Sequence, residues 1–457
     1  MSKEKVTAMP ENKMGTMSLG KLLLQMSLPM MISMFVQSLY NIIDSIFVAR
    51  ISEDALTAVS LAFPIQNLLI AVGVGTGVGI NSLLSRRLGE RRQDAVDKTA
   101  LNGVFIALCS AVVFVLIGIF VPHVYFESQT TNTGIIDYGV TYMRICLIVS
   151  VGIFGSITFE RLLQSTGKMF LSMISQLTGT VFNLVFDPLL IFGLCGFPKL
   201  GIAGAAIATV LGQIAAMIVS AILNLTHNKE INFSFKGFRP DGTVIKDIYA
   251  VGVPSVLLGS VGSVMVYFLN LILGSFSTTA IAVFGVYFKL QSFIFMPVFG
   301  LNNGAVPIIA YNFGAKKKHR IIRAVKLSSL AACCIMIVGT LLFELFPGFF
   351  LGLFNASDEM LSIGIPALRI IALHFPIAAF CIVFGCVFQA VGEGLQSMLV
   401  SFIRQLIVLL PVAWLLSLSG KLNFVWWAFP IAELSSLAAT VLFLAQTYKK
   451  YIKDLPD

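Results

Sequence analysis

Charged residues are scarce in this chain: Asp, Glu, Lys and Arg make up 12% of its 457 residues, whereas hydrophobic residues make up 57%. So apolar a composition excludes a water-soluble globular protein. Long apolar segments in lipid must satisfy their backbone hydrogen bonds internally, and a helix does so within one segment. We therefore predict an all-α integral membrane protein.

The apolar segments predict twelve transmembrane helices, each of at least the roughly 20 residues that cross the hydrocarbon core. The first segment is too long for a signal peptide and lacks a small-residue cleavage site, so we interpret it as a retained span. The expected spans lie near 22–48, 55–84, 99–121, 139–163, 169–194, 200–225, 248–274, 278–312, 325–346, 361–391, 395–418 and 424–447.

Cysteine and histidine provide no framework for a metal site or an active site. The seven cysteines and four histidines show neither a C-x-x-C motif nor the spacing of a zinc site. No Ser/His/Asp or Cys/His grouping is visible. We therefore expect neither enzymatic activity nor a cofactor.

The 31 basic residues outnumber the 22 acidic ones, and they cluster in alternate loops. This positive-inside pattern predicts a multi-pass protein of the plasma or inner membrane with both termini in the cytoplasm. It also indicates contact with anionic lipid headgroups rather than with nucleic acid. The main basic loops contain Arg86, Arg87, Arg91, Arg92 and Lys98; Lys229, Lys236, Arg239 and Lys246; and Lys316, Lys317, Lys318, Arg320, Arg323 and Lys326.

An internal duplication relates two stretches at a constant offset of 225 residues. Asp44 in the first stretch falls on Leu269 in the second, so only one copy has a carboxylate there. A duplicated apolar chain suggests two packed halves with a path between them, and the charge suggests that the first half carries a coupling ion. The matching residues are Pro29, Ala55, Gln66, Gly75, Gly79 and Gly89 with Pro254, Ala280, Gln291, Gly300, Gly304 and Gly314.

The longest hydrophilic break, from His227 to Asp247, divides the two copies. Each copy holds six spans running in the same direction, which predicts two lobes related by a pseudo-two-fold axis along the membrane normal. The expected domains are a polar N-terminal segment at 1–17, an N-lobe at 18–226, a cytoplasmic linker at 227–247 and a C-lobe at 248–457.

The run Gly73, Gly75, Gly77 and Gly79 resembles a nucleotide-binding loop by its letters alone. It lies within an apolar span, with no preceding strand and no following Lys-Ser/Thr. Close packing of helices through small residues is the better interpretation.

Polar residues form a stripe on the first span and another on the fifth. Their spacing, in steps of four, three and four, places each stripe on one helical face. Pro188, directly after the second stripe, cannot donate to the carbonyl of Leu184 and permits a bend there. The stripes consist of Ser33, Gln37, Tyr40 with Asn41, and Asp44; and of Gln176, Thr180, Asn183 and Asp187. The sixth span adds Thr209 and Gln213.

A carboxylate at mid-membrane costs at least a few kcal/mol unless it is protonated, paired or coordinated to a cation. Asp44 and Asp187 among amide and hydroxyl oxygens therefore indicate a site for a proton or a small hard cation. If the two acids approach each other, they cannot both ionise freely and should titrate together. The alternative is that the two acids are hydrogen-bonded to neighbouring Asn and Tyr side chains and have only a structural role in helix packing.

Six further charged residues lie within the predicted spans. We expect ion pairing or snorkelling for them, because isolated charges are costly in lipid. His374 is expected to be a hydrogen-bonded structural residue. The six are Lys289, Arg369, Arg404 and Glu433 in the second half and Arg144 and Glu160 in the first.

The chain resembles the multidrug and toxic compound extrusion (MATE) family over nearly its whole length. The resemblance implies two six-helix bundles around a V-shaped cleft, and export of amphipathic, often cationic compounds against a proton or sodium gradient. It also implies a cation-coupling site formed by Asp44, Asn183, Asp187 and Thr209. The motifs are the Leu-Pro-Met segment at 28–30, Gln37-x-x-Tyr40-Asn41-x-x-Asp44, Asn183-x-x-x-Asp187-Pro188 and Gly201-x-x-Gly204-Ala205-Ala206-x-Ala208-Thr209.

The leading hypothesis is thus a monomeric multidrug antiporter of amphipathic, cationic compounds, coupled to H+ or Na+. Span 248–274 contains no Asp or Glu, so a sodium site in the C-lobe is not expected. The alternatives are a lipid-linked saccharide flippase of the same superfamily and, from another class, an ion channel or receptor. We expect the substrate cavity to be lined by Gln37, Tyr40, Asn41, Gln176 and Thr180.

Overall fold

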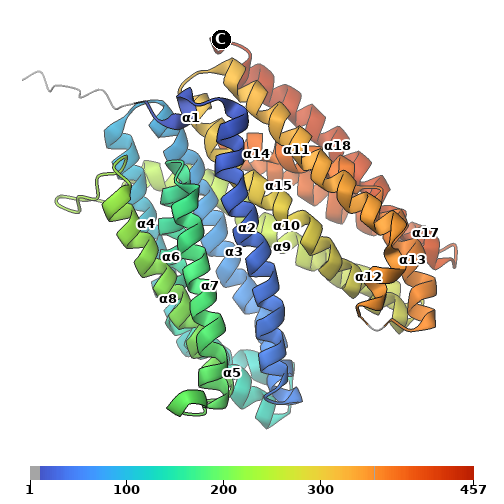
Figure 1. The fold of residues 1–457 in the computed structure, drawn as a ribbon. Coiled ribbons are helices and arrows are strands. Elements are labelled where there is room, and N and C mark those ends of the chain that lie inside the picture. Colours follow the sequence, from blue (N-terminus) through green and yellow to red (C-terminus); the bar gives the residue numbers. More distant parts are fainter. Residues whose placement is uncertain (1–10, 355, 457) are drawn as a thin grey trace, which may run out of the picture.

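The computed structural model describes residues 11–354 and 356–456, apart from the side chains of residues 41, 42, 45, 46, 49 and 53. Within these residues every regular element is a helix. The N-terminal half forms one bundle, blue to green in Figure 1, and the C-terminal half forms a second, yellow to red. The bundles meet at one end and separate towards the other, which confirms the predicted all-α, two-lobe fold.

The N-lobe contains the first eight α-helices. Its long helices extend several residues beyond most of the predicted spans, because the segments flanking the apolar runs are helical too. The helices are α1 (Lys13–Thr16), α2 (Leu19–Ala49), α3 (Glu53–Gly89), α4 (Gln93–Gln129), α5 (Thr133–Ile148), α6 (Val151–Ser165), α7 (Met169–Phe192), the short 3-10 turn η1 (Leu194–Gly196) and α8 (Ile202–His227).

The C-lobe repeats this order and includes two π-helical segments. Its helices are α9 (Gly242–Gly274), α10 (Thr278–Gly314), α11 (Lys318–Leu345), α12 (Pro347–Gly352), α13 (Asp358–Ala372), α14 (Phe375–Val391), α15 (Gly394–Phe402), η2 (Ile403–Leu409), α16 (Leu410–Ser417), α17 (Leu422–Val425), α18 (Ala428–Thr447) and η3 (Tyr448–Ile452).

Two of the expected spans are bent. In the described chain, 10 helices are long and apolar enough to cross a membrane by themselves, or up to 12 if each bent pair is one span. The pairs are α5 with α6, bent by 45°, and α13 with α14, bent by 47°. The breaks lie at residues 149–150 and 373–374, which are equivalent to within one residue under the 225-residue repeat. The bend therefore belongs to the duplicated unit.

Repeated glycines lie where the lobes meet. Helix α3 packs against α9 and α10, and α10 also packs against α2. A Cβ atom at Gly79 would overlap the carbonyl oxygen of Ile248, and one at Gly304 would lie 2.8 Å from the Cα of Ser27. Only small residues allow backbones to approach so closely. The packing interpretation of the glycine run is confirmed.

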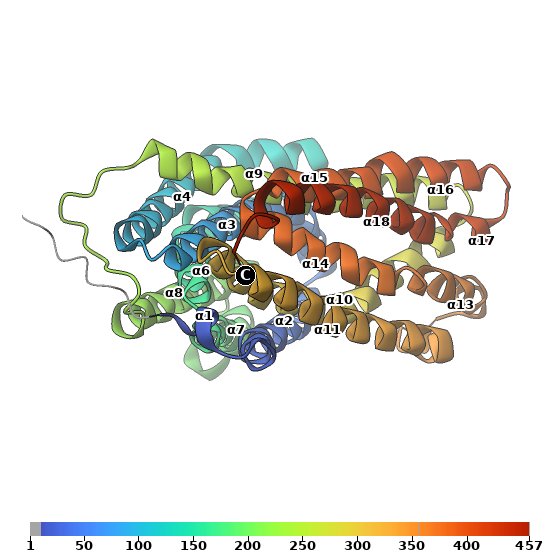
Figure 2. The ribbon, with the colours of Figure 1, turned by 90° about the horizontal axis from the view of Figure 1, so that it is seen from above.

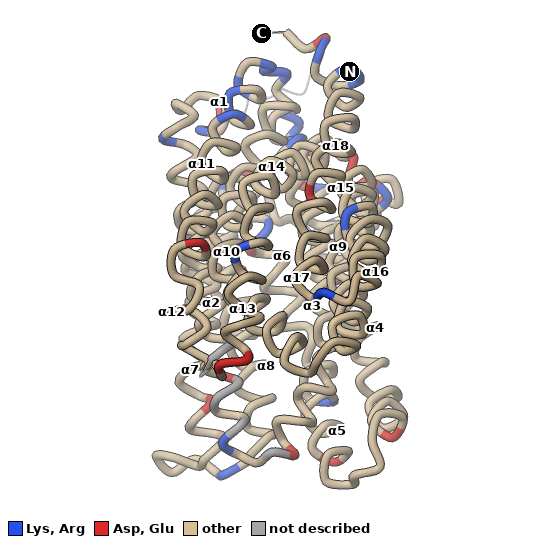
Figure 3. Tube along the Cα trace, turned by 90° about the vertical axis from the view of Figure 1, so that its right-hand side faces the viewer, with Lys and Arg blue, Asp and Glu red and all other residues tan. Residues whose placement is uncertain are grey.

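Lys and Arg residues gather at the end where the lobes meet, at the top of Figure 3, and we call this the basic end. The loops between α3 and α4 and between α10 and α11 lie there, as does α1. Viewed from this end, the two lobes lie side by side (Figure 2). The opposite end, which carries α5, α12 and α13, has fewer basic residues.

Candidate functional site

Two acidic side chains meet inside the N-lobe. The carboxyl groups of Asp44 on α2 and Asp187 on α7 are in hydrogen-bonding contact, and the two helices pack against each other. Asp187 is fully buried, whereas Asp44 is partly buried. A hydrogen bond between two carboxyl groups requires a proton on one of them. The pair can therefore hold one proton between two oxygens in this arrangement.

Asn183 connects this pair to α8. It lies one turn before Asp187 on α7, and in the orientation that satisfies its carboxamide its nitrogen donates to Asp187 Oδ2 over 2.5 Å. Its oxygen then accepts from Thr209 Oγ1 over 3.2 Å and from Tyr40 Oη over 2.9 Å. The structure thus brings Asp44, Asn183, Asp187 and Thr209 together.

Small residues on α7 and α8 make this approach possible. A Cβ atom at Gly212 would lie 2.7 Å from the carbonyl oxygen of Gly179 and 3.1 Å from the Cβ of Asn183. Larger residues at either glycine would push the helices apart and draw Thr209 away from Asn183. The helix α7 continues through Pro188, which directly follows the buried acid.

Sequence reasoning missed a second group of side chains beside the acids. Gln66 on α3 donates from Nε2 to Tyr142 Oη on α5 over 3.1 Å, and it lies 3.8 Å from Cys146 Sγ. Tyr142 is 4% exposed and close enough to Asp44 and Asp187 to interact electrostatically with both. The sequence pattern that could have identified this group is Tyr142 and Cys146, four residues apart and therefore on one face of an apolar span.

The residues predicted to line a substrate cavity have different surroundings. Tyr40 belongs to the acid cluster, whereas Gln37, one turn earlier on α2, is exposed. Gln176 donates to Glu160 Oε2 over 3.0 Å, and Thr180 donates to the carbonyl oxygen of Gln176 over 3.0 Å. The side chain of Asn41 lies outside the described residues.

Glu160 on α6 corrects one expectation. It is 8% exposed and accepts from Ser175 Oγ over 3.1 Å as well as from Gln176, but within the described chain it forms no ion pair. The neighbouring Arg161 instead donates to Gln164 Oε1 over 2.8 Å and across the lobes to Asn303 Oδ1 over 3.2 Å. Adjacent helical residues point about 100° apart, which separates these two charges.

In the C-lobe the expectation of ion pairing is confirmed for three of the charged residues, Arg404, Glu433 and Arg369. Arg404 Nη1 lies 3.1 Å from Glu433 Oε2, and Arg369 Nε lies 3.9 Å from Glu344 Oε2. His374 is 4% exposed, and its Nδ1 contacts the carbonyl oxygen of Ile371 at 2.5 Å, as expected for a structural histidine. Because Arg404 is neutralised by Glu433, it offers little free charge to an anion.

The donor set of the acid cluster suits a proton or a hard monovalent cation. Two carboxyl groups, an amide and a hydroxyl supply only oxygen ligands, which sodium accepts and softer transition metals disfavour. No group of three or more His, Cys, Asp or Glu residues that could hold a metal ion occurs in the part of the chain that the structure describes.

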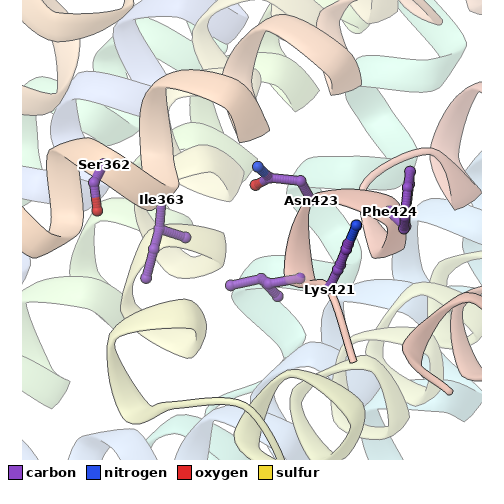
Figure 4. Close-up of a pocket in the computed structure, with 6 residues that line it drawn as sticks. Ser362, Ile363, Lys421, Asn423 and Phe424 are labelled. Carbon is purple, nitrogen blue, oxygen red and sulfur yellow. The ribbon is translucent and has the colours of Figure 1, made fainter. Parts of the chain in front are cut away.

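Two cavities lie away from the acid cluster. One, of about 500 Å³, lies between α13 and α17 in the C-lobe, where Ile363 faces the segment that carries Lys421 and Asn423 (Figure 4). The other, of about 520 Å³, lies at the basic end beside α1. Neither contains Asp44 or Asp187, so both are separate from the candidate coupling site.

Together the fold and site define a membrane transporter: two lobes built from parallel repeats, with a pair of acids buried inside one lobe. The MatE family model matches residues 29–189 and 254–415, once in each lobe. The chain therefore belongs to the MATE family of multidrug efflux transporters, and it is a multi-pass membrane protein, not an enzyme.

Curated relatives are similar over most of the chain. The multidrug export protein MepA of Staphylococcus saprophyticus is 26% identical over 431 residues, covering 93% of both chains. MepA of Staphylococcus aureus strain MRSA252 is 25% identical over 432 residues, covering 92% of this chain and 93% of the relative.

Solved structures share the fold. An outward-facing multidrug resistance MATE transporter of the MOP superfamily superposes with a TM-score of 0.90 at 24% identity, covering 99% of this chain and all of the other. A MOP superfamily transporter from Pyrococcus furiosus, described as having a binding pocket of reverse polarity, superposes with a TM-score of 0.88 at 24% identity, covering 98% and 100%.

Proposed function

We propose that the protein is a secondary active multidrug antiporter that exports amphipathic, cationic compounds in exchange for H+ or Na+. The contact between Asp44 and Asp187 is the observation that carries this proposal. Acids inside a membrane helix bundle are expensive and typically mark ion pathways. The name of the MepA relatives, multidrug export protein, supports the substrate class.

Coupling follows from the charge of the acid pair. When the two carboxyl groups share one proton, the pair carries one negative charge; when the proton leaves, it carries two. A cationic substrate in the N-lobe stabilises the more negative state, so substrate binding and proton release favour each other. By thermodynamic linkage, protonation weakens substrate binding by the same factor.

The surrounding hydrogen bonds position the pair. Asn183 donates a hydrogen bond to Asp187 and is hydrogen-bonded to Thr209 and Tyr40. A change in the charge of Asp187 would therefore alter hydrogen bonds that join α2, α7 and α8. The direct contact between the carboxyl groups favours H+, because two unprotonated carboxylates would repel each other at this distance. A sodium ion would need to lie between the same four side chains.

We also propose that the basic end faces the cytoplasm, since membrane proteins retain Lys and Arg on that side. The protein would then lie in the plasma membrane with both termini inside. The lobes at 18–226 and 248–457, joined by the linker at 227–247, would alternate as two bodies. The end at which the bundles separate would then face the outside (Figure 1). Because one chain supplies both lobes, a monomer is sufficient.

The orientation is tested by single-cysteine labelling with a membrane-impermeant reagent, on a background without the exposed Cys195. A cysteine at position 129 should react from outside the cell, and one at position 317 only after permeabilisation. Labelling of position 317 from outside would overturn the orientation.

Transport is tested with purified protein in liposomes. A fluorescent organic cation should move against its own gradient when an opposing proton or sodium gradient is imposed, and an ionophore that collapses the gradient should stop it. Movement that ignores both gradients would indicate a channel, and movement of a lipid-linked saccharide alone would indicate a flippase. Either result contradicts the proposed antiport.

A further inference from the structure

At the basic end, the segment of residues 11–17 lies across both lobes. Glu11 forms ion pairs with Arg91 of the N-lobe, at 3.3 Å, and with Lys317 of the C-lobe. The carbonyl oxygen of Met14 accepts from Arg320 Nη2 over 3.0 Å, and the Met14 side chain is fully buried. This N-terminal segment is therefore held by both lobes at once.

A cavity of about 520 Å³ lies between this segment, the N-lobe and the chain that follows α8. Its size is within the range of small-molecule sites. Polar and charged residues supply most of the side chains around it. Its lining consists of Glu11, Asn12, Lys13, Leu88, Arg91, Gln93, Thr166, Lys168, His227, Lys229, Glu230 and Tyr311.

The two acids of the cavity already have cationic partners. Glu230 pairs with Lys168 at 2.8 Å, and Glu11 is held between Arg91 and Lys317. Lys168 also donates to the carbonyl oxygen of His227 over 2.7 Å. No acid is left for the two remaining lysines of the lining.

Lys13 is the first of these two lysines. It is half-buried, and within the described residues its ammonium group has no hydrogen-bond acceptor. Burial lowers the pKa of Lys13, and the nearby charge of Lys168 lowers it further, while Glu230 only partly offsets this. Lys229 is the second; it is exposed, and it too has no hydrogen-bond or ion-pair partner in the part of the chain that the structure describes. The acids of the lining thus pair with Lys168, Arg91 and Lys317, whereas Lys13 and Lys229 have no carboxylate partner among the described residues.

We propose that this cavity binds a phosphate-bearing anion, either a lipid headgroup or a soluble phosphate compound. Phosphate oxygens accept several charge-assisted hydrogen bonds at once, and lysine is a common partner for them. A ligand that joins Lys13 to Lys168 and Lys229 connects the N-terminal segment to the N-lobe and the linker. Since the C-lobe also holds that segment, the bound anion favours the arrangement in which the lobes are closed at the basic end.

The test measures thermal unfolding of the full-length protein in nanodiscs. One arm titrates inorganic phosphate into discs of zwitterionic lipid, with sodium chloride at matched ionic strength as the control. The other replaces part of the lipid by phosphatidylglycerol. We expect a saturable rise of the unfolding temperature in one arm, which identifies the source of the phosphate. A rise in neither arm would overturn the proposal.

Matched variants locate the site. In Lys13→Gln and Lys229→Gln the apparent affinity should fall on the order of tenfold, the loss of one charge-assisted hydrogen bond. Lys236→Gln removes the same charge from an exposed linker residue outside the cavity and should leave the affinity unchanged. An equal response in Lys13→Gln and Lys236→Gln would indicate general charge screening and refute the site.

The test is independent of transport. Asp187→Asn, which removes an acid of the proposed coupling pair, should retain the response to the anion because the cavity lies at the basic end. Failure of the antiport hypothesis would therefore leave this result intact, and failure of anion binding would leave antiport intact.

Discussion

Gly89 and Gly314 hold equivalent positions in the two halves of the chain, and each packs against the other lobe at the basic end. A Cβ atom at Gly89 would overlap the carbonyl oxygen of Tyr311, and one at Gly314 would overlap the carbonyl oxygen of Arg86. The duplicated sequence thus supplies both sides of the contact that closes the molecule there.

The first prediction concerns this contact. Gly314→Ala should destabilise the protein by about 1–3 kcal/mol, because the backbones of α3 and α10 would have to separate. Gly285→Ala, on the same helix with no neighbouring atom within 4 Å, should be neutral or slightly stabilising. Thermal unfolding of both variants checks this. Equal unfolding temperatures for the two variants would show that the close contact of α3 and α10 at Gly314 does not contribute to stability.

The second prediction concerns the acid pair. Asp44→Asn and Asp187→Asn should each abolish gradient-driven efflux, because either change removes a carboxyl group that the exchanged ion needs. Folding should persist, since removing a buried charge relieves its desolvation cost. Gln25→Ala, at an exposed position on the same helix and outside its polar stripe, is the control for a general disturbance of α2. Full efflux by either asparagine variant in liposomes would remove the pair from the mechanism.

The third prediction concerns exchange of ion and substrate. For proton coupling, the affinity for a fluorescent organic cation should rise with pH and then level off, because protons and substrate compete for the same negative charge. For sodium coupling, sodium should lower that affinity at fixed pH. Equilibrium binding to solubilised protein distinguishes the two. If that affinity changes with neither pH nor sodium, in the wild type and in Asp44→Asn alike, exchange of ion and substrate in the N-lobe is ruled out.

The fourth prediction concerns the N-terminal segment. The hydrogen bond from Lys317 holds the pKa of Glu11 below its ordinary value of 4.5, with Arg91 adding to the effect. A lowered pKa means that Glu11 stabilises the attachment fully at neutral pH. This contribution decreases as the pH falls below 4.5 towards the lowered pKa. Glu11→Gln should therefore loosen the segment at neutral pH.

Hydrogen exchange over residues 11–17 measures this loosening. Glu90→Gln is a suitable control, because Glu90 pairs at 3.7 Å with Arg92 of its own loop rather than with the segment. Faster exchange in Glu11→Gln than in Glu90→Gln is expected. Identical exchange in the two variants would show that Glu11 does not hold the segment.

Much of this protein follows from its sequence, because the bilayer leaves an apolar chain few alternatives. Long apolar runs must become helices, the duplication requires two similar lobes, and a stripe such as Asn183 and Asp187 must share one helical face. The same reasoning identifies the glycine run that includes Gly79 as a packing position, and the contact of Gly79 with Ile248 bears this out.

Helical periodicity says which residues share a face, but not which helix that face meets. Only the tertiary structure places Tyr142 and Gln66 beside the acids. It also pairs Gln176 with Glu160, and it forms the hydrogen bond from Arg161 to Asn303 of the other lobe. These partners are distant in sequence, and packing of several helices decides between contacts of similar local energy. The sequence therefore determined the helices and their polar faces, whereas the packing of the helices determined how those faces combine into a site.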